Sequence, residues 1–182
     1  MRPTKRAAEA TSNQHMLIRP EQSKDLSAVH ALNASAFGTP AEADLVDALR
    51  EQVQPVISLV AEENGFILGH ILFSPVTLSE HPELKIMGLA PLAVAPAQQR
   101  KGIGSALVRA GLERCQQLGF GAVVVLGHPG YYPRFGFLPS TRYGIGCEYE
   151  VPEEVFMVVK LQPGFLQGVS GKIKYHSAFN DL

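Results

Sequence analysis

Hydrophobic residues recur every three or four positions in three stretches of the chain, and this spacing predicts three helices. The helices are expected at residues 21–37, in the stretch that follows Pro40, and at residues 103–118. Ser23 and Asp25 are interpreted as caps of the first helix, because short polar side chains accept hydrogen bonds from free helix amides. Thr39 and Glu42 have the spacing of a capping box at the start of the second. Gly119 predicts the end of the third.

Runs of apolar and β-branched residues predict six strands, at residues 17–20, 56–61, 66–76, 86–94, 122–126 and 155–161. The pair Asn64-Gly65 lies between the second and third strands and suits a tight hairpin. The run 122–126 is apolar throughout, as in strands that are buried on both faces of a parallel sheet. Together with the strand 86–94 and the helix between them, it predicts a parallel crossover within a mixed sheet.

This order of elements predicts one domain, from residue 16 to residue 162. Residues 1–15 are polar and lack the apolar segment of a signal peptide, so we expect a flexible tail there. Residues 163–182 contain three glycines and are expected to form an ordered loop, a C-terminal extension packed on the domain.

Composition narrows the function classes. The net charge of −1 over 182 residues gives no general attraction to nucleic acid or to an anionic membrane. No apolar run of the sequence approaches the ~20 residues that span a bilayer. The cysteines, Cys115 and Cys147, lack metal-binding spacing, and Cys115 falls on the apolar side of a predicted helix. We therefore expect no metal site, no disulfide framework and a cytoplasmic location, and the oligomeric state stays open, a homodimer included.

The turn between the strand 86–94 and the helix that follows it is a candidate phosphate site. Gly102 and Gly104 stand where the first amides of a helix lack intrahelical partners and the helix dipole is positive. A phosphate satisfies both conditions, and Arg100 and Lys101 add positive charge. On these residues alone, a plain strand-to-helix turn is an equal alternative. A Walker loop would need a lysine after Gly104, and a dinucleotide fingerprint would need glycine or alanine at Leu107.

Three segments together resemble one known family. They are the strand end Pro91-Leu92-Ala93-Val94, the motif Gln99-x-x-Gly102-x-Gly104 and the stretch Tyr131–Phe137. These are similar to the coenzyme A signature and the later aromatic segment of the GNAT N-acetyltransferases, in particular of their bacterial YhbS-like branch. The resemblance covers about residues 17–161. It implies a single-domain α/β (α+β) fold, with a mixed, mostly antiparallel sheet around a central parallel strand–helix–strand crossover.

The same resemblance implies that acetyl-coenzyme A is the cosubstrate. Its pyrophosphate is expected on the backbone amides from Gln99 to Ser105, and its pantetheine arm along the strand at residues 92–94. The residues implied in cofactor binding are Leu92, Ala93, Val94, Gln99, Arg100, Lys101, Gly102, Ile103, Gly104, Ser105, Tyr131 and Phe135.

Tyr132 matches the tyrosine that often protonates the departing thiolate in this family. The chemistry fits, because a phenol with a pKa near ~10 can donate to a thiolate whose acid has a pKa near ~8.5. Packing is the alternative for two adjacent tyrosines. The sequence departs from many relatives just before this point, since Gly127-His128-Pro129-Gly130 stands where they carry an asparagine and a helical turn.

Glu42 is the candidate base that takes the proton from the amine through a water molecule. Its alternative is the capping role already given. His128 follows a strand end, where it can either face the site or make structural hydrogen bonds, and the second interpretation is preferred. His70 is interpreted as a packing or edge residue within a strand.

We therefore expect an enzyme that moves an acetyl group from acetyl-coenzyme A directly to a primary amine of a small molecule or peptide. A backbone amide near Val94 would stabilise the oxyanion that forms. The alternative function is an acyl-coenzyme A sensor or interaction module of the same fold without turnover. The acceptor amine itself cannot be identified from the sequence.

Overall fold

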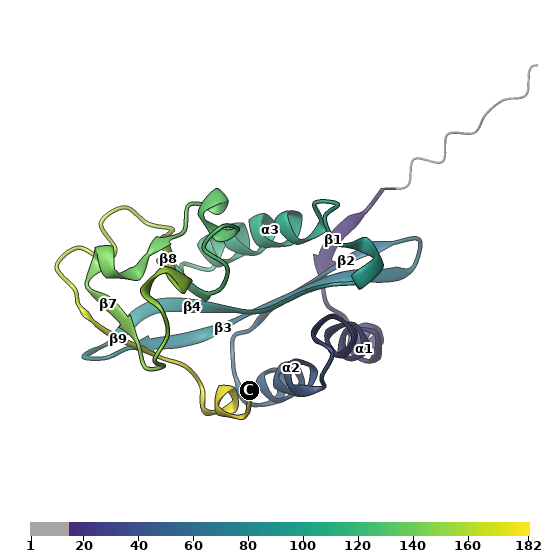
Figure 1. Ribbon diagram of the computed structural model, residues 1–182, viewed down its shortest axis with the longest axis horizontal. Helices are drawn as coiled ribbons and strands as arrows, with labels where there is room; N and C mark the ends of the chain where they lie inside the picture. The colour runs from purple at the N-terminus through teal and green to yellow at the C-terminus, as the bar shows by residue number, and fades with distance from the viewer. Residues whose placement is uncertain (1–14) are drawn as a thin grey trace, which may run out of the picture.

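The computed structural model describes residues 15–182, which form one mixed sheet with helices on both faces (Figure 1). The strands are β1 (Leu17–Pro20), β2 (Ile57–Glu63), β3 (Phe66–Leu78), β4 (His81–Val94), β5 (Ala122–Leu126), β6 (Leu138–Pro139), β7 (Ile145–Cys147), β8 (Phe156–Lys160) and β9 (Gly171–Lys174). The α-helices are α1 (Leu26–Phe37), α2 (Ala41–Gln52) and α3 (Ile103–Gln117). Short 3-10 helices span Ser23–Asp25, Pro96–Gln98, Tyr132–Phe135, Ser140–Tyr143, Glu153–Val155 and Ser177–Asp181. The flexible tail expected over residues 1–15 lies outside the described residues except for its last position.

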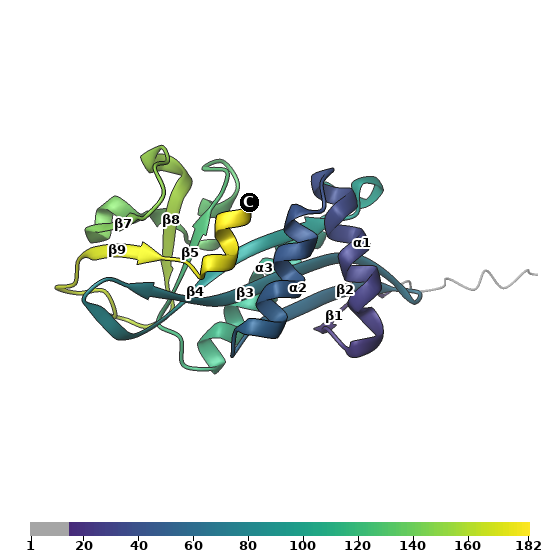
Figure 2. The ribbon, with the colours of Figure 1, turned by 90° about the horizontal axis from the view of Figure 1, so that it is seen from below.

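The predicted fold class is confirmed. The strands follow the order β1-β2-β3-β4-β5-β8-β6, with β9 paired to β3 and β7 paired to β9. The pairs β4–β5 and β7–β9 are parallel, and the other strand pairs of the described chain are antiparallel. Helix α3 crosses one face of the sheet between β4 and β5, while α1 and α2 lie side by side on the other face (Figure 1, Figure 2).

Each face of the sheet buries its own hydrophobic cluster, because successive strand residues point to opposite sides. In β3, Leu72 faces α1 and α2, whereas Phe73 belongs to the cluster under α3. Gly111 lets α3 approach closely, since a Cβ there would lie 2.2 Å from the Phe73 ring. Cys115 is fully buried as predicted, and burial raises the pKa of its thiol to about 12. Within residues 15–182, no helix is both long enough and apolar enough to cross a membrane.

Strands β4 and β5 stay paired over a short length. Residues Ile86–Leu89 of β4 pair with Ala122–Val125 of β5. Beyond Leu89, β4 continues to Val94 with β3 as its neighbour, in the register Ile71 to Leu92 and Gly69 to Val94. The two central strands therefore part on the side of the sheet where the helix α3 begins.

The start of the first helical region differs from the prediction. A 3-10 turn at Ser23–Asp25 precedes α1, and the Asp25 carboxylate accepts a hydrogen bond from the amide of Gln22 at 2.7 Å. The same carboxylate receives two further bonds from the Arg19 guanidinium, at 2.7 and 2.9 Å. Asp25 is thus a buried ion-pair partner of β1, because Arg19 faces it across the turn, and it does not cap a continuous helix.

The capping box predicted for Thr39 and Glu42 is wrong. Helix α2 begins one residue later than a Thr39 cap requires, with Pro40 in the cap position and no side-chain cap within the described residues. The Thr39 hydroxyl accepts from the Ala41 amide and donates to the Glu42 carboxylate, both at 3.3 Å. Glu42 therefore accepts a hydrogen bond from a side chain instead of from a free backbone amide. A capping role consequently does not explain why a carboxylate stands at this position.

The predicted hairpin turn at Asn64-Gly65 is confirmed, whereas the loop predicted after residue 162 is wrong for part of that segment. Asn64 and Gly65 both adopt positive φ, at 51° and 82°, as a two-residue hairpin turn requires. The segment after residue 162 was expected to be loop, yet it contains β9, whose Ile173 is fully buried and pairs with Leu78 of β3. A strand with a single buried hydrophobic position between two lysines is too short to give a periodic signal. The boundary at residue 162 stays a proposal.

His70 is fully buried between β3 and α1, so its interpretation as a packing residue is confirmed. The amide nitrogen of Asn33 lies 3.1 Å from its Nδ1, and the Ser58 hydroxyl lies 2.8 Å from its Nε2. Ser58 donates in turn to Glu21, which pairs with Arg50 at 2.7 Å. This chain of polar groups joins both helices of one face to the sheet.

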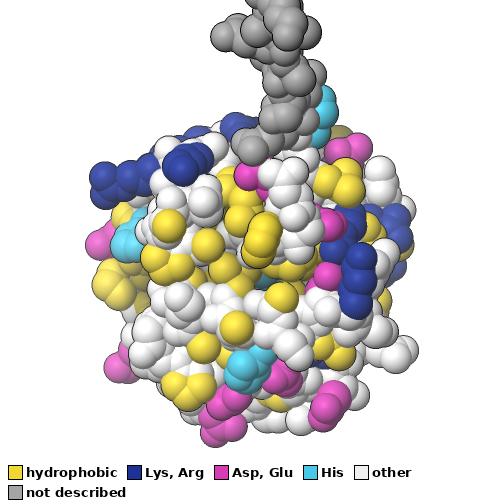
Figure 3. Space-filling view, turned by 90° about the vertical axis from the view of Figure 1, so that its right-hand side faces the viewer, with side chains coloured by type: hydrophobic (Ala, Val, Ile, Leu, Met, Phe, Trp, Pro, Cys, Tyr) yellow, Lys and Arg dark blue, Asp and Glu magenta, His cyan; other side chains and the backbone are white. Residues whose placement is uncertain are grey.

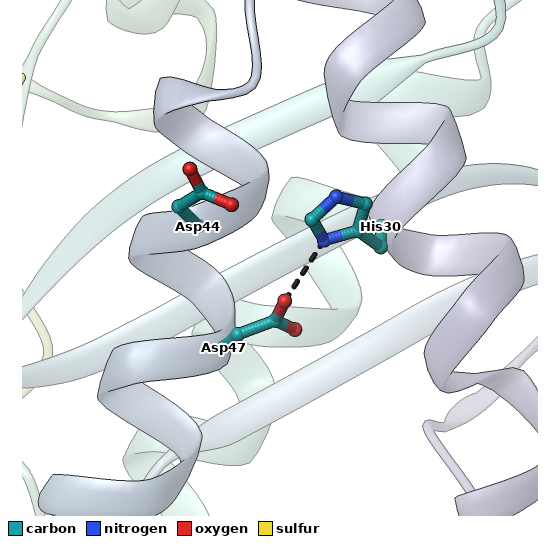
Figure 4. Close-up of side chains that lie close together, drawn as sticks. All are labelled: His30, Asp44 and Asp47. Carbon is teal, nitrogen blue, oxygen red and sulfur yellow. Dashed lines mark hydrogen bonds and ion pairs between the residues drawn. The ribbon is translucent and has the colours of Figure 1, made fainter.

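A second polar contact joins α1 to α2 directly. His30 lies 2.8 Å from Asp47 (Figure 4). Asp47 also accepts a hydrogen bond from Arg50 at 2.8 Å. Asp44 lies close to this pair: one ligand atom from each of His30, Asp44 and Asp47 lies within 4.8 Å of the other two. The Arg50 charge opposes a cation at the same carboxylate, so we interpret the His30–Asp47 contact as a tie between the helices, to which Asp44 contributes no bond within residues 15–182.

The Arg19–Asp25 pair predicts an acid-dependent part of the stability. Hydrogen bonding to Arg19 lowers the pKa of Asp25 from 3.8 to about 2. Because the folded pKa is the lower one, this contribution is complete above pH 3.8 and is lost as the pH falls through about 2. Asp25→Asn should lower the free energy of unfolding at pH 7 by about 2 kcal/mol, and the deficit should shrink toward pH 2.

Urea unfolding at pH 7, 4 and 2.5 would measure this deficit. Asp44→Asn is the matched control, because the Asp44 carboxylate makes no ion pair within residues 15–182. An Asp25→Asn deficit that stayed constant with pH would show that the carboxylate charge contributes nothing.

Candidate active site

The free edge of β4 forms the floor of the site. The Ala95 amide donates to the Leu68 carbonyl across the β3 side, at 2.9 Å. Since strand amides alternate in direction, the amides of Val94 and Leu92 point to the opposite edge, where β5 has parted from β4. The Val94 carbonyl on that edge accepts a hydrogen bond from the Gln99 side chain at 3.3 Å. This bond ties the following turn to the end of the strand.

The turn into α3 leaves backbone amides free. Gly102 is the cap residue with φ of 84°, Arg100 is also left-handed with φ of 63°, and no side chain of the described residues caps the helix. The first intrahelical bond runs from the Ala106 amide to the Gly102 carbonyl, at 3.1 Å. The amides of residues 103–105 consequently lack partners within the helix, and the helix dipole adds positive potential there.

A cavity of about 570 Å³ opens in front of these amides. It is lined by Leu92, Val94, Gln98, Gln99, Arg100, Gly102, Ile103, Gly104, Ser105, Tyr131 and Arg134. A Cβ on Gly104 would lie 3.0 Å from the Tyr131 hydroxyl, which itself lies 3.4 Å from the Ser105 hydroxyl. The cavity thus combines free amides and two guanidinium groups with an apolar strand edge, a composition that suits a phosphorylated ligand with an extended arm.

Tyr131 is held by its own segment. The Arg134 guanidinium lies 4.5 Å from the centre of the Tyr131 ring and donates to the Tyr131 carbonyl at 2.9 Å. Phe135 packs edge-on against the same ring, with ring centres 5.3 Å apart. These contacts direct the Tyr131 hydroxyl toward the start of α3 and fix one wall of the cavity.

The Tyr132 side chain points away from the first cavity and does not line it. Its side chain is buried, packs edge-on against Phe137 and lies over Gly127, where a Cβ would come within 2.2 Å of the ring. Gly127 was not among the predicted site residues, because a glycine that accommodates a distant ring has no sequence signature of its own. Burial first, and the neighbouring Tyr131 second, raise the pKa of Tyr132 above its ordinary range, so the phenol stays protonated at neutral pH.

A second cavity, of about 530 Å³, lies on the far side of Leu92. It is lined by Phe37, Glu42, Leu45, Leu89, Ala90, Pro91, Leu92, Leu126, Gly127, His128, Tyr132, Val151, Val155 and Leu182. Leu92 is the residue that lines both cavities. A ligand in the first cavity and a ligand in the second can therefore meet beside Leu92, in reach of Tyr132.

Three of the predicted cofactor residues line neither cavity. Ala93 is buried on the other face of β4, the Lys101 ammonium donates to Gln98 at 3.3 Å, and Phe135 supports Tyr131 from behind. Arg134 and Gln98 line the first cavity although neither was predicted to bind the cofactor. The signal for Arg134 was present in the aromatic segment, whose Lys/Arg position it occupies.

The end of the molecule that carries the β2–β3 turn is hollowed between the helical layers (Figure 3). A band of hydrophobic side chains crosses this face, and Lys and Arg side chains lie on both flanks with Asp and Glu side chains among them (Figure 3). The surface at this end is thus apolar at its centre and carries charges of both signs around it.

Known proteins resemble this chain in sequence and in fold. A family model described as the acetyltransferase (GNAT) family matches residues 26–137. The chain is 38% identical to the N-acetyltransferase YhbS of Escherichia coli K12 over 166 residues, which cover 91% of this chain and 99% of that protein. It is 40% identical to the N-acetyltransferase YjhQ of the same organism over 144 residues, or 77% of this chain and 80% of that one.

Solved structures agree with the sequence comparison. The crystal structure of E. coli YhbS in complex with CoA matches with a TM-score of 0.86 and 35% identity, covering 98% of this chain and 96% of that chain. A GNAT family acetyltransferase from Brucella melitensis in complex with acetyl-CoA matches with a TM-score of 0.76 and 35% identity, covering 91% and 99%. With a family match over more than half of its length and two close structural relatives, the chain belongs to the acetyltransferase (GNAT) family.

Proposed function

We propose that this chain transfers an acetyl group from acetyl-coenzyme A directly to a primary amine of a small molecule or peptide. The observation that carries the proposal is that two cavities of different chemistry meet at Leu92. The first offers free amides and arginines, and the second offers the Glu42 carboxylate and Tyr132. The coenzyme A complexes of the E. coli and Brucella relatives support the assignment of the first cavity.

In this proposal the pyrophosphate accepts hydrogen bonds from the amides of residues 103–105, and Arg100 balances its charge. The pantetheine arm runs along the free edge of β4 and pairs with the backbone of Leu92 and Val94 in place of a strand. Gln99 contributes by holding the turn against the Val94 carbonyl, at 3.3 Å, so its role is to position the amides. The thioester then lies beside Leu92.

The reaction needs no covalent enzyme intermediate. The amine nitrogen forms a bond to the thioester carbon, and a free amide of the β4 edge donates to the oxygen that becomes negative. When the carbon–sulfur bond breaks, the electron pair leaves with sulfur, and Tyr132 donates the proton that converts thiolate to thiol. The proton that the new amide nitrogen releases then returns to the Tyr132 phenolate. The raised pKa keeps the Tyr132 phenol protonated at neutral pH, and because it also makes the phenol a weaker acid, the proton moves only as negative charge develops on sulfur.

Glu42 is the proposed base. Its carboxylate lines the second cavity, is half-buried, and accepts a hydrogen bond from Thr39 at 3.3 Å, which fixes its direction. It can take the proton that the ammonium releases before attack, directly or through water. His128 lines the same cavity but is exposed, and no hydrogen bond within residues 15–182 orients its ring.

Tyr132→Phe tests the proton donor. Loss of the hydroxyl should lower kcat by about 100-fold, because general acid catalysis contributes on that scale, and leave the Kd for coenzyme A within about twofold. Thiol release from acetyl-coenzyme A with a panel of amines measures kcat, and calorimetry measures binding. Tyr143→Phe is the control, since Tyr143 lies outside both cavities. An unchanged kcat in Tyr132→Phe would assign the residue to packing alone.

The panel also distinguishes an enzyme from a binding module. Thiol release by the wild type with at least one primary amine supports transfer. Tight binding of acetyl-coenzyme A without release for any amine would favour a sensor of the same fold.

Gly102→Ala tests the phosphate turn against a matched control, Gly38→Ala. Both glycines have left-handed φ, at 84° and 73°, and neither would place a Cβ within 4 Å of another group. Each alanine should therefore cost about 1–2 kcal/mol of stability. Gly102→Ala alone should raise the Kd for coenzyme A, by about tenfold or more, because its methyl group obstructs the phosphate. Equal Kd values in the two variants would make Gly102 a purely structural residue.

Gly127→Ala tests whether the position of the Tyr132 ring matters. A Cβ at Gly127 would lie 2.2 Å from that ring, so the tyrosine has to move, whereas a Cβ at Gly130 meets nothing within 4 Å. We expect kcat to fall by about 10-fold or more in Gly127→Ala and to stay unchanged in Gly130→Ala. Coenzyme A binding should survive in both. Full activity in a folded Gly127→Ala protein would contradict the proposed role of Tyr132.

A further inference from the structure

Exposed hydrophobic side chains gather at the second cavity. Seven large hydrophobic residues of the described chain are exposed, and three of them line this one cavity. Phe37, at the end of α1, is 41% exposed, Leu126, at the end of β5, is 37% exposed, and Leu182 is 58% exposed. Single exposed hydrophobic residues are ordinary, but a group of them drawn from distant parts of the chain around one hollow marks a binding surface.

The two cavities are lined by side chains of opposite charge. Arg100 and Arg134 line the first cavity. Among the described residues that line the second, no Lys or Arg side chain occurs, and Glu42 is the carboxylate side chain. Among the described lining residues, His128 is the one basic side chain, so a carboxylate or phosphate on the acceptor would lose its hydration there without gaining a permanently charged partner, which is costly. A second ammonium group would likewise find no second carboxylate side chain among those residues.

From these two observations, and resting on the proposed function, we infer that the acceptor is a primary amine carried by an uncharged apolar body, an aryl-alkyl or alkyl amine. Glu42 takes the ammonium end, and Phe37 and Leu126 cover the apolar body. A cavity of about 530 Å³ is within the size range of sites for such small molecules. Amino acids with a free carboxylate, phosphorylated amines and polyamines are poor acceptors.

The test compares amines that differ in one property. Phenethylamine and phenylalanine differ only in a carboxylate, while spermidine adds charge instead of apolar surface. With wild-type protein and saturating acetyl-coenzyme A, kcat/KM for phenethylamine should exceed the values for phenylalanine and spermidine by about 100-fold or more. Along the series from propylamine to hexylamine, kcat/KM should rise by about fourfold for each added CH₂ group.

Two substitutions test the residues that line the second cavity. Phe37→Ser should raise KM for phenethylamine by about tenfold with a smaller change in kcat, because it removes apolar contact from the body of the substrate. Phe66→Ser is the matched control, since Phe66 is 71% exposed but lines a different hollow, beside α1. Leu126→Arg should raise the ratio of phenylalanine to phenethylamine turnover by about tenfold, because it supplies a partner for the carboxylate.

The outcomes separate this inference from the proposed function. If phenylalanine or spermidine reacts as fast as phenethylamine, or if Phe37→Ser and Phe66→Ser behave alike, the apolar acceptor is wrong while acetyl transfer to an amine stands. If none of the amines releases thiol although acetyl-coenzyme A binds, the proposed function fails and the inference fails with it.

Discussion

The short pairing between β4 and β5 is the constraint on which the rest of the site depends. Four residues of each strand form the parallel ladder, and β4 then runs on with one neighbour. The unpaired edge of β4 exposes backbone amides that need hydrogen-bond partners. Beyond Leu89, β5 no longer supplies them. The start of α3 lies beside the same edge, with three free amides of its own. In the proposed function, an extended ligand that carries a phosphate at one end satisfies both sets of groups.

In the proposed function, the parting of the strands also separates the two reactants. Adjacent residues of one segment serve opposite sides, since the Tyr131 hydroxyl meets the start of α3 while Tyr132 turns over Gly127 toward the second cavity. The second cavity is completed by residues from α1, α2 and β5 and by Leu182, which follows the last 3-10 helix; that helix packs beside α2. The buried chain of polar groups around His70 holds α1 and α2 on the sheet, and so it positions Glu42 at the cavity wall from a distance.

Much of this arrangement could be predicted from the sequence, because it depends on local patterns. The crossover around α3, the Asn64-Gly65 turn and the glycine turn before α3 each have a short-range signature, and the structure confirms these three elements. Features that depend on distant contacts could not be predicted. Glu42 matched a capping box by spacing, yet Pro40 shifted the cap by one residue. The role of Gly127 under Tyr132 and the walls of the second cavity involve residues that meet only in the folded chain.

Amide chemical shifts in ¹⁵N-labelled protein test most directly whether the turn holds the pyrophosphate. Titration with coenzyme A should move the amide resonances of Ile103, Gly104 and Ser105 the most, together with those of Leu92 and Val94. Titration with pantetheine, which lacks the phosphates, should move the β4 resonances and leave the three helix amides nearly unchanged. Equal shifts of the helix amides with both ligands, or no shift with coenzyme A, would contradict a phosphate site at the start of α3.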